Sequence, residues 1–257
     1  MLMRDFTYRT YRELLGSIKG QGYEFQTIAE FLTKSKDRAM ILRHDVDSWP
    51  ANALKMAKIE NEAGIKSTYY FRISPLSFNK KIILSIKEFG HEIGYHYEDL
   101  SSNNGDYFKA IRTFEQNLRK LQELYPVKTI AMHGKPLSKW NNLDLWKKYD
   151  FKYFDIIGES YLSFDFDSML YLTDTGNCWN GYQSSIRDTV KSRYSFNIHT
   201  SFDLIEHLGK DLLPPKIMLN IHPARWNDNI LKWIIRYYVL TLPKSELKKW
   251  IKIRRAL

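Results

Sequence analysis

Short apolar runs and amphipathic segments alternate along most of the chain. Residues 39–47 are an apolar run without a turn signal that ends in charged residues, which is typical of a buried strand. Residues 51–63 have the apolar spacing of a helix and stop at Gly64, a residue that often follows a helix. The same pattern predicts strands over 67–73, 91–98, 129–133, 155–158, 169–173 and 216–222, and helices over 79–87, 106–124, 143–149, 201–208 and from about 227 onward.

Repeated strand–helix units favour a parallel sheet covered by helices, which is an α/β fold. About seven strands in a chain of 257 residues fit a closed or nearly closed barrel, in which chemistry takes place at the carboxyl ends of the strands. No linker or repeat divides the sequence, so we expect a single domain over residues 1–257. Its barrel core would span about 38–242, and a basic C-terminal helix would span 244–257.

Two carboxylates end the first of these predicted strands. Asp45 and Asp47 are two positions apart, so their side chains point to the same face of a strand. Adjacent carboxylates at the end of a buried strand are costly unless a cation or a proton relieves their repulsion. The pair suits one carboxylate that binds a metal and a neighbour that acts as a base. The alternative interpretation is a surface turn with two solvated aspartates.

Histidines follow other predicted strands. His96 lies near the end of the strand over 91–98, where a neutral imidazole is a good ligand for zinc or a similar metal. Alone, it would more often be a hydrogen-bonded structural histidine, and the nearby aspartates reverse that preference. His133, Asp174 and His222 also stand at or just past strand ends. We expect all of these side chains to meet at one edge of the barrel.

Composition narrows the function classes. The net charge is +10, which fits nucleic acid, an anionic membrane surface or an anionic substrate, but we find no nucleic-acid-binding signature. The single cysteine, Cys178, excludes an intramolecular disulfide. The first residues contain no apolar signal segment, and no stretch approaches the length of a membrane span, so a cytoplasmic protein is expected.

Three motifs together resemble those of a known family. Asp45-Val46-Asp47, the run from Gly90 to His96, and Ile221-His222-Pro223 resemble the polysaccharide deacetylase family, which is also called the NodB-homology or carbohydrate esterase 4 group. The motifs occur in the family's order between about residues 38 and 235. The resemblance implies a distorted (β/α)7 barrel, a divalent metal that is usually zinc, and hydrolytic removal of an acetyl group from an N- or O-acetylated sugar.

The resemblance also implies roles for single residues. Asp45 matches the general base that activates water, and Asp47 matches the carboxylate that binds the metal. His96 matches the first metal-binding histidine, and His222 matches the general acid that protonates the leaving group.

The chain departs from the family pattern at two positions. The family's second metal-binding histidine corresponds to Leu100, which cannot bind a metal. His133 stands where the family has an arginine that orients the base. Three interpretations follow: His133 supplies the missing ligand from a neighbouring strand, Glu98 supplies it, or the site binds metal weakly or not at all.

Four residues are candidates for substrate contact. Asp174 and Trp179 lie where the family keeps an acidic and aromatic substrate-contacting motif, and they could hydrogen-bond and stack on a sugar. Arg225 and Trp226 follow His222 and could line the same mouth. The alternative is a loop in which Asp174 caps backbone amides.

We therefore expect a metal-dependent hydrolase that deacetylates an intracellular carbohydrate or glycan precursor through an amide or ester bond. The alternative is a catalytically degenerate deacetylase-fold protein that binds a saccharide or a protein partner, since Leu100 and the lost arginine weaken the pattern. A third hypothesis is peripheral contact of the basic tail with an anionic polymer or membrane surface. No nucleic-acid partner is expected.

Overall fold

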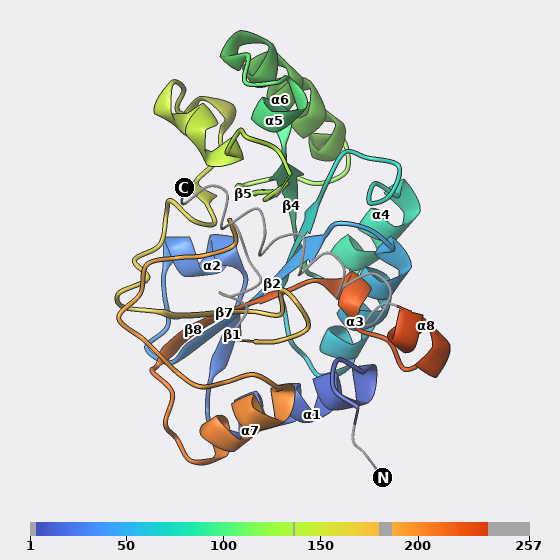
Figure 1. Cartoon of the computed structure of the whole chain (residues 1–257), viewed down its shortest axis with the longest axis vertical. Coiled ribbons are helices and arrows are strands. Elements are labelled where there is room, and N and C mark those ends of the chain that lie inside the picture. Colours follow the sequence, from blue (N-terminus) through green and yellow to red (C-terminus); the bar gives the residue numbers. More distant parts are fainter. Residues whose placement is uncertain (1–3, 136, 180–186, 236–257) are drawn as a thin grey trace.

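A single parallel sheet contains every strand in the described part of the chain. The computed structural model describes residues 4–135, 137–179 and 187–235 (Figure 1). The strand order is β6-β5-β4-β3-β2-β8-β7, β1 pairs with β2 beside this path, and all recorded pairs are parallel. The strands are β1 (Glu24–Gln26), β2 (Ala39–Val46), β3 (Thr68–Phe71), β4 (Glu92–Tyr97), β5 (Thr129–Met132), β6 (Gly158–Glu159), β7 (Leu170–Thr173) and β8 (Lys216–Ile221).

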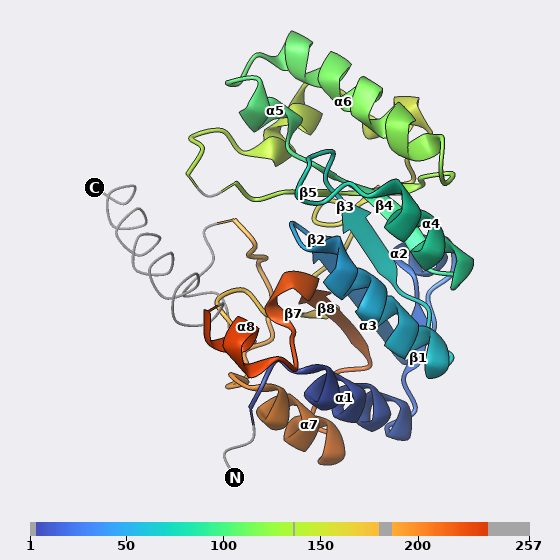
Figure 2. The ribbon, with the colours of Figure 1, turned by 90° about the vertical axis from the view of Figure 1, so that its right-hand side faces the viewer.

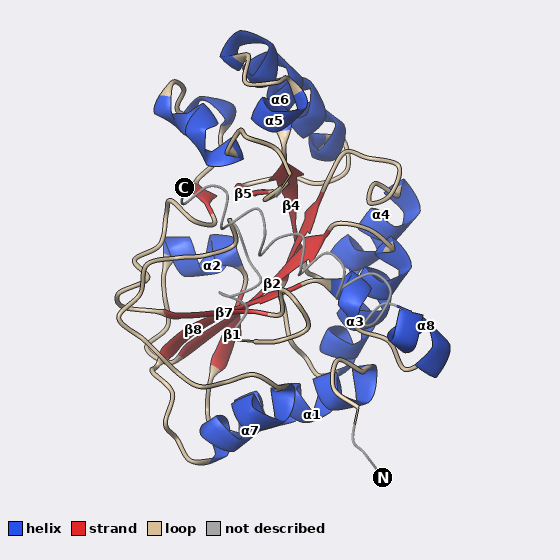
Figure 3. Cartoon of the chain, in the orientation of Figure 1, coloured by secondary structure: helices blue, strands red, loops and turns tan. Residues whose placement is uncertain are grey.

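Helices cover the outside of the sheet (Figure 3). Helices α1 and α7 pack together below the sheet in the view of Figure 1, and α3 and α4 lie side by side on one flank in Figure 2. In the described residues, the α-helices are α1 (Tyr8–Gly20), α2 (Ile28–Thr33), α3 (Pro50–Glu62), α4 (Lys80–Glu88), α5 (Asp99–Ser102), α6 (Tyr107–Gln122), α7 (Ser201–Gly209) and α8 (Ile230–Ile234). Short 3-10 helices there are η1 (Asn142–Lys147), η2 (Phe151–Phe154) and η4 (Pro223–Arg225).

This architecture confirms the predicted α/β fold class. The parallel sheet curls into a half-barrel whose end strands are β6 and β7, as expected for a distorted barrel of seven main strands. Because the strands are parallel, the residues that follow β2, β4, β5 and β8 all emerge at the same edge of the sheet. Within the described residues, no helix is long and apolar enough to cross a membrane.

The structure differs from the sequence-based prediction at the N-terminus. The predicted core started near residue 38, whereas β1 already pairs with β2, from Glu24 opposite Ala39 to Gln26 opposite Ile41. Helix α1 precedes it and buries Tyr11, Leu14 and Ile18. The predicted short helix over 143–149 is the 3-10 helix η1, and the strand predicted at 155–158 begins only at residue 158. The predicted basic helix over 244–257 lies outside the described residues.

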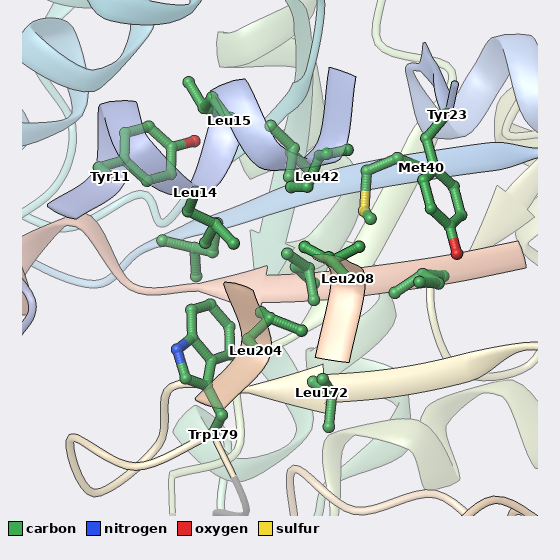
Figure 4. Packing of buried hydrophobic residues seen from close by; sticks show 14 of the residues in the cluster. Tyr11, Leu14, Leu15, Tyr23, Met40, Leu42, Leu172, Trp179, Leu204 and Leu208 are labelled. Atoms are coloured by element: carbon green, nitrogen blue, oxygen red, sulfur yellow. The ribbon is translucent and has the colours of Figure 1, made fainter. Parts of the chain in front are cut away.

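Alternate side chains of β2 pack into two hydrophobic clusters on opposite faces of the sheet. Met40 and Leu42 face the layer between the sheet and α1, where they pack with Leu14 and Leu15 of α1 and with α7 (Figure 4). Ile41 faces the barrel interior with other apolar side chains. Since side chains alternate along a strand, Arg43 and Asp45 share the interior face with Ile41.

Gly94 lets β4 pass close to its neighbours inside the barrel. A Cβ at this position would meet the ring of Tyr70 and would lie 2.8 Å from the carbonyl oxygen of Thr129. A larger residue would therefore push β4 away from β3 and β5.

A buried carboxylate ties α3 to the outer face of the sheet. Glu60 of α3 accepts hydrogen bonds from Tyr11, from Ser67 Oγ at 2.5 Å and from Tyr69 Oη at 2.9 Å. His44 Nε2 lies 2.7 Å from Glu60 Oε1, close enough for an ion pair although not aligned for a hydrogen bond. Burial opposes ionisation, but His44 and the other partners outweigh it and lower the pKa of Glu60 to about 2.

We expect Glu60→Gln to destabilise the fold, and the loss to shrink in acid. Because the folded-state pKa of Glu60 lies below its ordinary value of 4.5, its ionised form contributes stability above that pH, and this contribution disappears as the pH falls toward about 2. Urea unfolding at several pH values measures the gap between wild type and variant. Glu62→Gln, on the exposed side of the same helix, is the control. A gap that does not change between pH 7 and pH 3 would contradict the assignment.

Candidate functional site

A pocket opens at the carboxyl ends of the strands, where the sequence analysis expected chemistry. It is open to solvent, and its cavity volume is about 80 Å³. Most of the predicted polar residues line it, together with several that were not predicted. The lining residues are Asp45, Asp47, His96, Met132, His133, Gly134, Lys135, Tyr161, Thr175, Arg187, Asp188, His222 and Arg225.

The carboxylate of Asp45 is clamped by an arginine of its own strand. Arg43 Nε donates to Asp45 Oδ1 at 2.9 Å, and Arg43 Nη2 donates to Oδ2 at 2.8 Å. Arg43 is fully buried, and its guanidinium carbon lies 4.5 Å from the ring centroid of Tyr161. Asn220 of β8 adds a third donor to Asp45 Oδ2 at 3.2 Å.

The contact with Arg43 keeps the Asp45 carboxylate ionised. Burial opposes ionisation of the carboxyl, but Arg43 and then His96 outweigh it, so the pKa of Asp45 is lowered from 3.8. The bidentate pair also fixes the direction of the carboxylate. Asp45 is therefore an ionised and oriented acceptor at the floor of the pocket.

Asp47 lies between two histidines from two other strands. Asp47 Oδ1 is 3.4 Å from His96 Nε2 and 3.5 Å from His133 Nε2. His96 is the fifth residue of β4, and His133 directly follows β5, so the sheet brings all three side chains together. Although the Asp47 side chain is 30% exposed, its Oδ1 atom is buried and has no hydrogen-bond partner.

The other nitrogen of each imidazole already has a partner. His96 Nδ1 lies 3.0 Å from the carbonyl oxygen of Ala131, and His133 Nδ1 lies 2.9 Å from Glu98 Oε2. Both contacts require Nδ1 to carry the hydrogen, because a carbonyl and a carboxylate only accept. In the neutral form of each ring, Nε2 then presents a lone pair toward the carboxylate oxygen of Asp47. Three electron-rich atoms so arranged need a proton or a metal cation between them.

The electrostatics of Asp47 and His96 reflect this convergence. Burial opposes ionisation of Asp47, but His133 and His96 outweigh it and hold the pKa well below its usual range. Burial likewise opposes protonation of His96, yet Asp45 and Asp47 raise the pKa of His96 above 6.5. The site thus attracts positive charge at this point.

Glu98 supports His133. Glu98 Oε2 accepts a hydrogen bond from His133 Nδ1, and Glu98 Oε1 accepts one from Arg72 Nη2 at 2.7 Å. Burial opposes ionisation, but His133 and Arg72 outweigh it and lower the pKa of Glu98 to about 2. Both carboxylate oxygens are therefore engaged, which disfavours Glu98 as a direct ligand. Leu100, at the family's second histidine position, packs in an apolar cluster.

His222, at the carboxyl end of β8, is held by Asp174. His222 Nδ1 lies 2.7 Å from Asp174 Oδ1, and the His222 backbone N–H donates to Asp174 Oδ2 at 3.0 Å. Trp226 Nε1 donates to the same Oδ2 at 2.9 Å, and Arg225 Nη1 donates to the Asp174 carbonyl oxygen at 3.1 Å. The contact with Asp174 leaves Nε2 of His222 as the nitrogen that can act at the pocket.

The structure corrects three of the four predicted substrate contacts. Asp174, Trp179 and Trp226 are completely buried, so none of them can touch or stack on a sugar. Asp174 orients His222, while Trp179 (Figure 4) and Trp226 belong to the hydrophobic core beside α1. Indole rings at these positions serve packing because the N-terminal segment, unpredicted from the sequence, covers them. Arg225 lines the pocket while its guanidinium also contacts Asp174.

Arg187 and Asp188 are among the unpredicted pocket residues, and both lie far in the sequence from any motif. Asp188 accepts hydrogen bonds from the hydroxyls of Tyr161 at 2.9 Å, Thr173 at 2.6 Å and Thr175 at 2.9 Å. Arg187 donates to the carbonyl oxygens of Gly134, Ser138 and Trp140 in the loop after His133. Arg43 was also not predicted. Its position two residues before Asp45 on a predicted strand places both side chains on one face and could have indicated the pair.

The donors around Asp47 suit a divalent cation. Two ligands of a tetrahedral zinc ion are about 3.3 Å apart, close to the 3.4 and 3.5 Å found here. The orphaned, buried Asp47 Oδ1 marks the point where the cation would relieve repulsion. Among the described residues, no group of three or more His, Cys, Asp and Glu side chains is placed so that it could hold a metal ion. The residue types therefore fit a metal, as do the two distances from Asp47 Oδ1 to the imidazole nitrogens, and three-ligand binding requires local adjustment.

Comparisons with known proteins give only distant structural similarity. The sequence matches no model of a known protein family and no curated protein. A CE4 family pseudoenzyme from Bacillus anthracis is 11% identical with a TM-score of 0.44, and the match covers 83% of this chain and 62% of that one. A family 4 carbohydrate esterase from Bacillus anthracis is 13% identical with a TM-score of 0.41, covering 94% and 85% of the two chains. A CE4 esterase from Streptococcus mutans is 15% identical with a TM-score of 0.45, covering 92% and 91%.

We expect Arg43→Met to destabilise the protein by about 3–5 kcal/mol, because it leaves the buried Asp45 carboxylate without its counter-charge. Asp45→Asn should also destabilise, since it leaves Arg43 unpaired. The double variant should lose much less than the sum of the two, and chemical denaturation measures all three. Arg119→Met on the exposed side of α6 serves as the control. Additive losses in the double variant would show that the pair is not coupled.

Proposed function

We propose that this protein is a metal-dependent hydrolase that removes an acyl group, through an amide or ester bond, from a carbohydrate or glycan precursor. The observation that carries the proposal is the convergence of two imidazole Nε2 atoms, from His96 and His133, on the orphaned oxygen of Asp47. An oriented carboxylate, Asp45, and an oriented histidine, His222, line the same pocket.

Asp47, His96 and His133 would hold the metal, most suitably zinc, since two imidazoles and a carboxylate are a common zinc donor set. When bound, the metal supplies Lewis-acid polarisation of the acyl carbonyl and acidifies a water molecule. Glu98 keeps the Nδ1 hydrogen of His133 in place and thereby directs Nε2 toward the metal.

Asp45 is placed to accept the proton of the attacking water. Arg43 holds both carboxylate oxygens from below and keeps the group ionised at neutral pH. The same pairing limits its basicity, so the water must be acidified before Asp45 can take its proton.

His222 is placed to give a proton to the leaving nitrogen or oxygen. Asp174 accepts from His222 Nδ1 and would stabilise the charged imidazolium, as the carboxylate partner of a histidine does in other hydrolases. Proton acceptance and donation are thus assigned to separate residues of two neighbouring strands, β2 and β8.

The motif resemblance is what points to an acylated sugar as the substrate class, with an intracellular precursor in the cytoplasm as the expected setting. Arg225 remains as a proposed substrate contact because it lines the pocket beside His222. It would meet the leaving-group side of the substrate.

One observation favours a second function, saccharide binding without catalysis. Both oxygens of Asp45 already accept from Arg43, and no complete three-ligand metal geometry is preformed among the described residues. Indifference of ligand binding to removal of metal, together with the absence of hydrolysis, would identify this binding role.

We expect His133→Ala to weaken zinc affinity more than Glu98→Gln does. The histidine would lose a direct donor, whereas the glutamate variant loses only the support of Nδ1, which typically costs about 10–100-fold. Isothermal titration with zinc measures both affinities, and His91→Ala, a histidine on the other face of the sheet, is the control. Unchanged affinity in His133→Ala would remove His133 from the ligand set.

We expect Asp45→Asn and His222→Gln each to lower kcat by about 10²–10⁴-fold while zinc is retained, because each removes one proton transfer. Asp47→Ala should lose both zinc and activity. Release of acetate from a panel of N- and O-acetylated sugars, with zinc content measured in parallel, provides the test. Full activity of Asp45→Asn would contradict its role as the base.

A further inference from the structure

Exposed large apolar side chains gather on the same side of the molecule as the pocket. Residues that follow the carboxyl ends of parallel strands emerge at one edge of the sheet. Most of the large hydrophobic side chains exposed in the described part of the chain lie in such segments. They are Trp49 after β2, Leu76 after β3, Leu137 after β5, Leu162 after β6, and Ile230, Leu231, Ile234 and Ile235 in and beside α8 after β8.

Helix α8 is the largest contribution. Ile230 is 53% exposed, Leu231 67% and Ile234 41%, and Ile235, which directly follows the helix, is 49% exposed. The exposed surface here is therefore mostly apolar, with Lys232 as its one exposed cation among the described residues 230–235. It follows the pocket residue Arg225 by only a few positions. In Figure 2 helix α8 and the loop after β5 both lie on the left-hand side of the molecule.

Cations accompany the apolar side chains after β3, after β5 and in α8, whereas the segments around Trp49 and Leu162 contain aspartates. The segments 72–81, 133–141 and 223–235 contain no acidic residue except Asp228, whose Oδ1 accepts from the backbone of Tyr8. The exposed basic residues of the three segments are Lys80, Lys81, Lys139 and Lys232, whereas Lys135 is half-buried and Arg72 and Arg225 pair with Glu98 and Asp174. The chain as a whole carries a net charge of +10.

We propose that this rim, defined by Leu76, Leu137, α8 and the lysines beside them, docks the protein onto an anionic lipid bilayer. The proposal rests on the proposed function for its consequence, which is that the substrate is an acylated saccharide carried by a lipid. Docking would bring the pocket mouth to the membrane surface, where the head group of such a lipid is presented.

The combination of residue types favours a bilayer over a protein partner. Protein interfaces are depleted in lysine at their cores. Membrane-surface contacts instead combine leucine, isoleucine and tryptophan, which enter the acyl boundary, with lysine, which meets anionic head groups. The rim combines both types, and lysines such as Lys80, Lys81 and Lys232 are exposed.

The test is sedimentation of the full chain with vesicles of phosphatidylcholine alone or mixed with phosphatidylglycerol. We expect binding to the anionic vesicles, weakened by salt, and little binding to phosphatidylcholine. Leu231→Ser combined with Ile235→Ser should weaken binding about tenfold or more, since two aliphatic anchors are lost. Leu212→Ser is the matched control, because Leu212 is 54% exposed but precedes β8, at the other edge of the sheet.

A second variant pair, Lys80→Gln with Lys81→Gln, tests the charge contribution and should reduce binding to the anionic vesicles only. Absence of vesicle binding by the wild type would overturn the proposal, and would leave a protein partner for the rim. Equal binding by wild type and the Leu231/Ile235 variant would also overturn it, and would assign any lipid contact to the basic sequence 244–257. Vesicle binding needs no catalysis, so Asp47→Ala should bind vesicles like wild type. Vesicle binding without hydrolysis would therefore contradict the hydrolase proposal and leave the docking proposal intact.

Discussion

Two ionised carboxylates at the end of a buried strand each need a counter-charge, and the pocket is arranged around how each one receives it. Asp45 receives it from Arg43, two positions earlier on β2, so the pair is complete within one strand. Asp47 faces the imidazoles of His96 and His133, whose facing nitrogens carry lone pairs when neutral. Burial increases the need of each carboxylate for a counter-charge, because charges interact more strongly where water is excluded.

The rest of the site supports these two solutions. Glu98 and the Ala131 carbonyl hold the Nδ1 hydrogens of the two imidazoles, which turns both Nε2 atoms toward Asp47. Asp174 does the same for His222 on the other side of the pocket. The parallel sheet places these residues together, because the ends of β2, β4, β5 and β8 lie at one edge of the sheet.

The sequence predicted the sheet and the main polar residues because both follow short-range rules. Alternation placed Asp45 and Asp47 on one face, and strand ends placed His96 and His222 at one edge. The burial of Trp179 and Trp226 was not predictable in this way, because it depends on α1, whose packing is a long-range event. The place of Asp188 in the pocket was not predictable either. This residue lies outside any strand, and its position depends on hydrogen bonds from hydroxyl groups elsewhere in the sequence, such as that of Thr173.

The central claim is that Asp47, His96 and His133 share one divalent cation. Crystals soaked in zinc and measured at the zinc absorption edge would test it directly through an anomalous difference map. The account predicts a single strong peak within coordination distance of Asp47 Oδ1 and both Nε2 atoms, about 2.0–2.2 Å. A map with no peak there, or with a peak held by other residues while His96 and His133 keep their present partners, would contradict it.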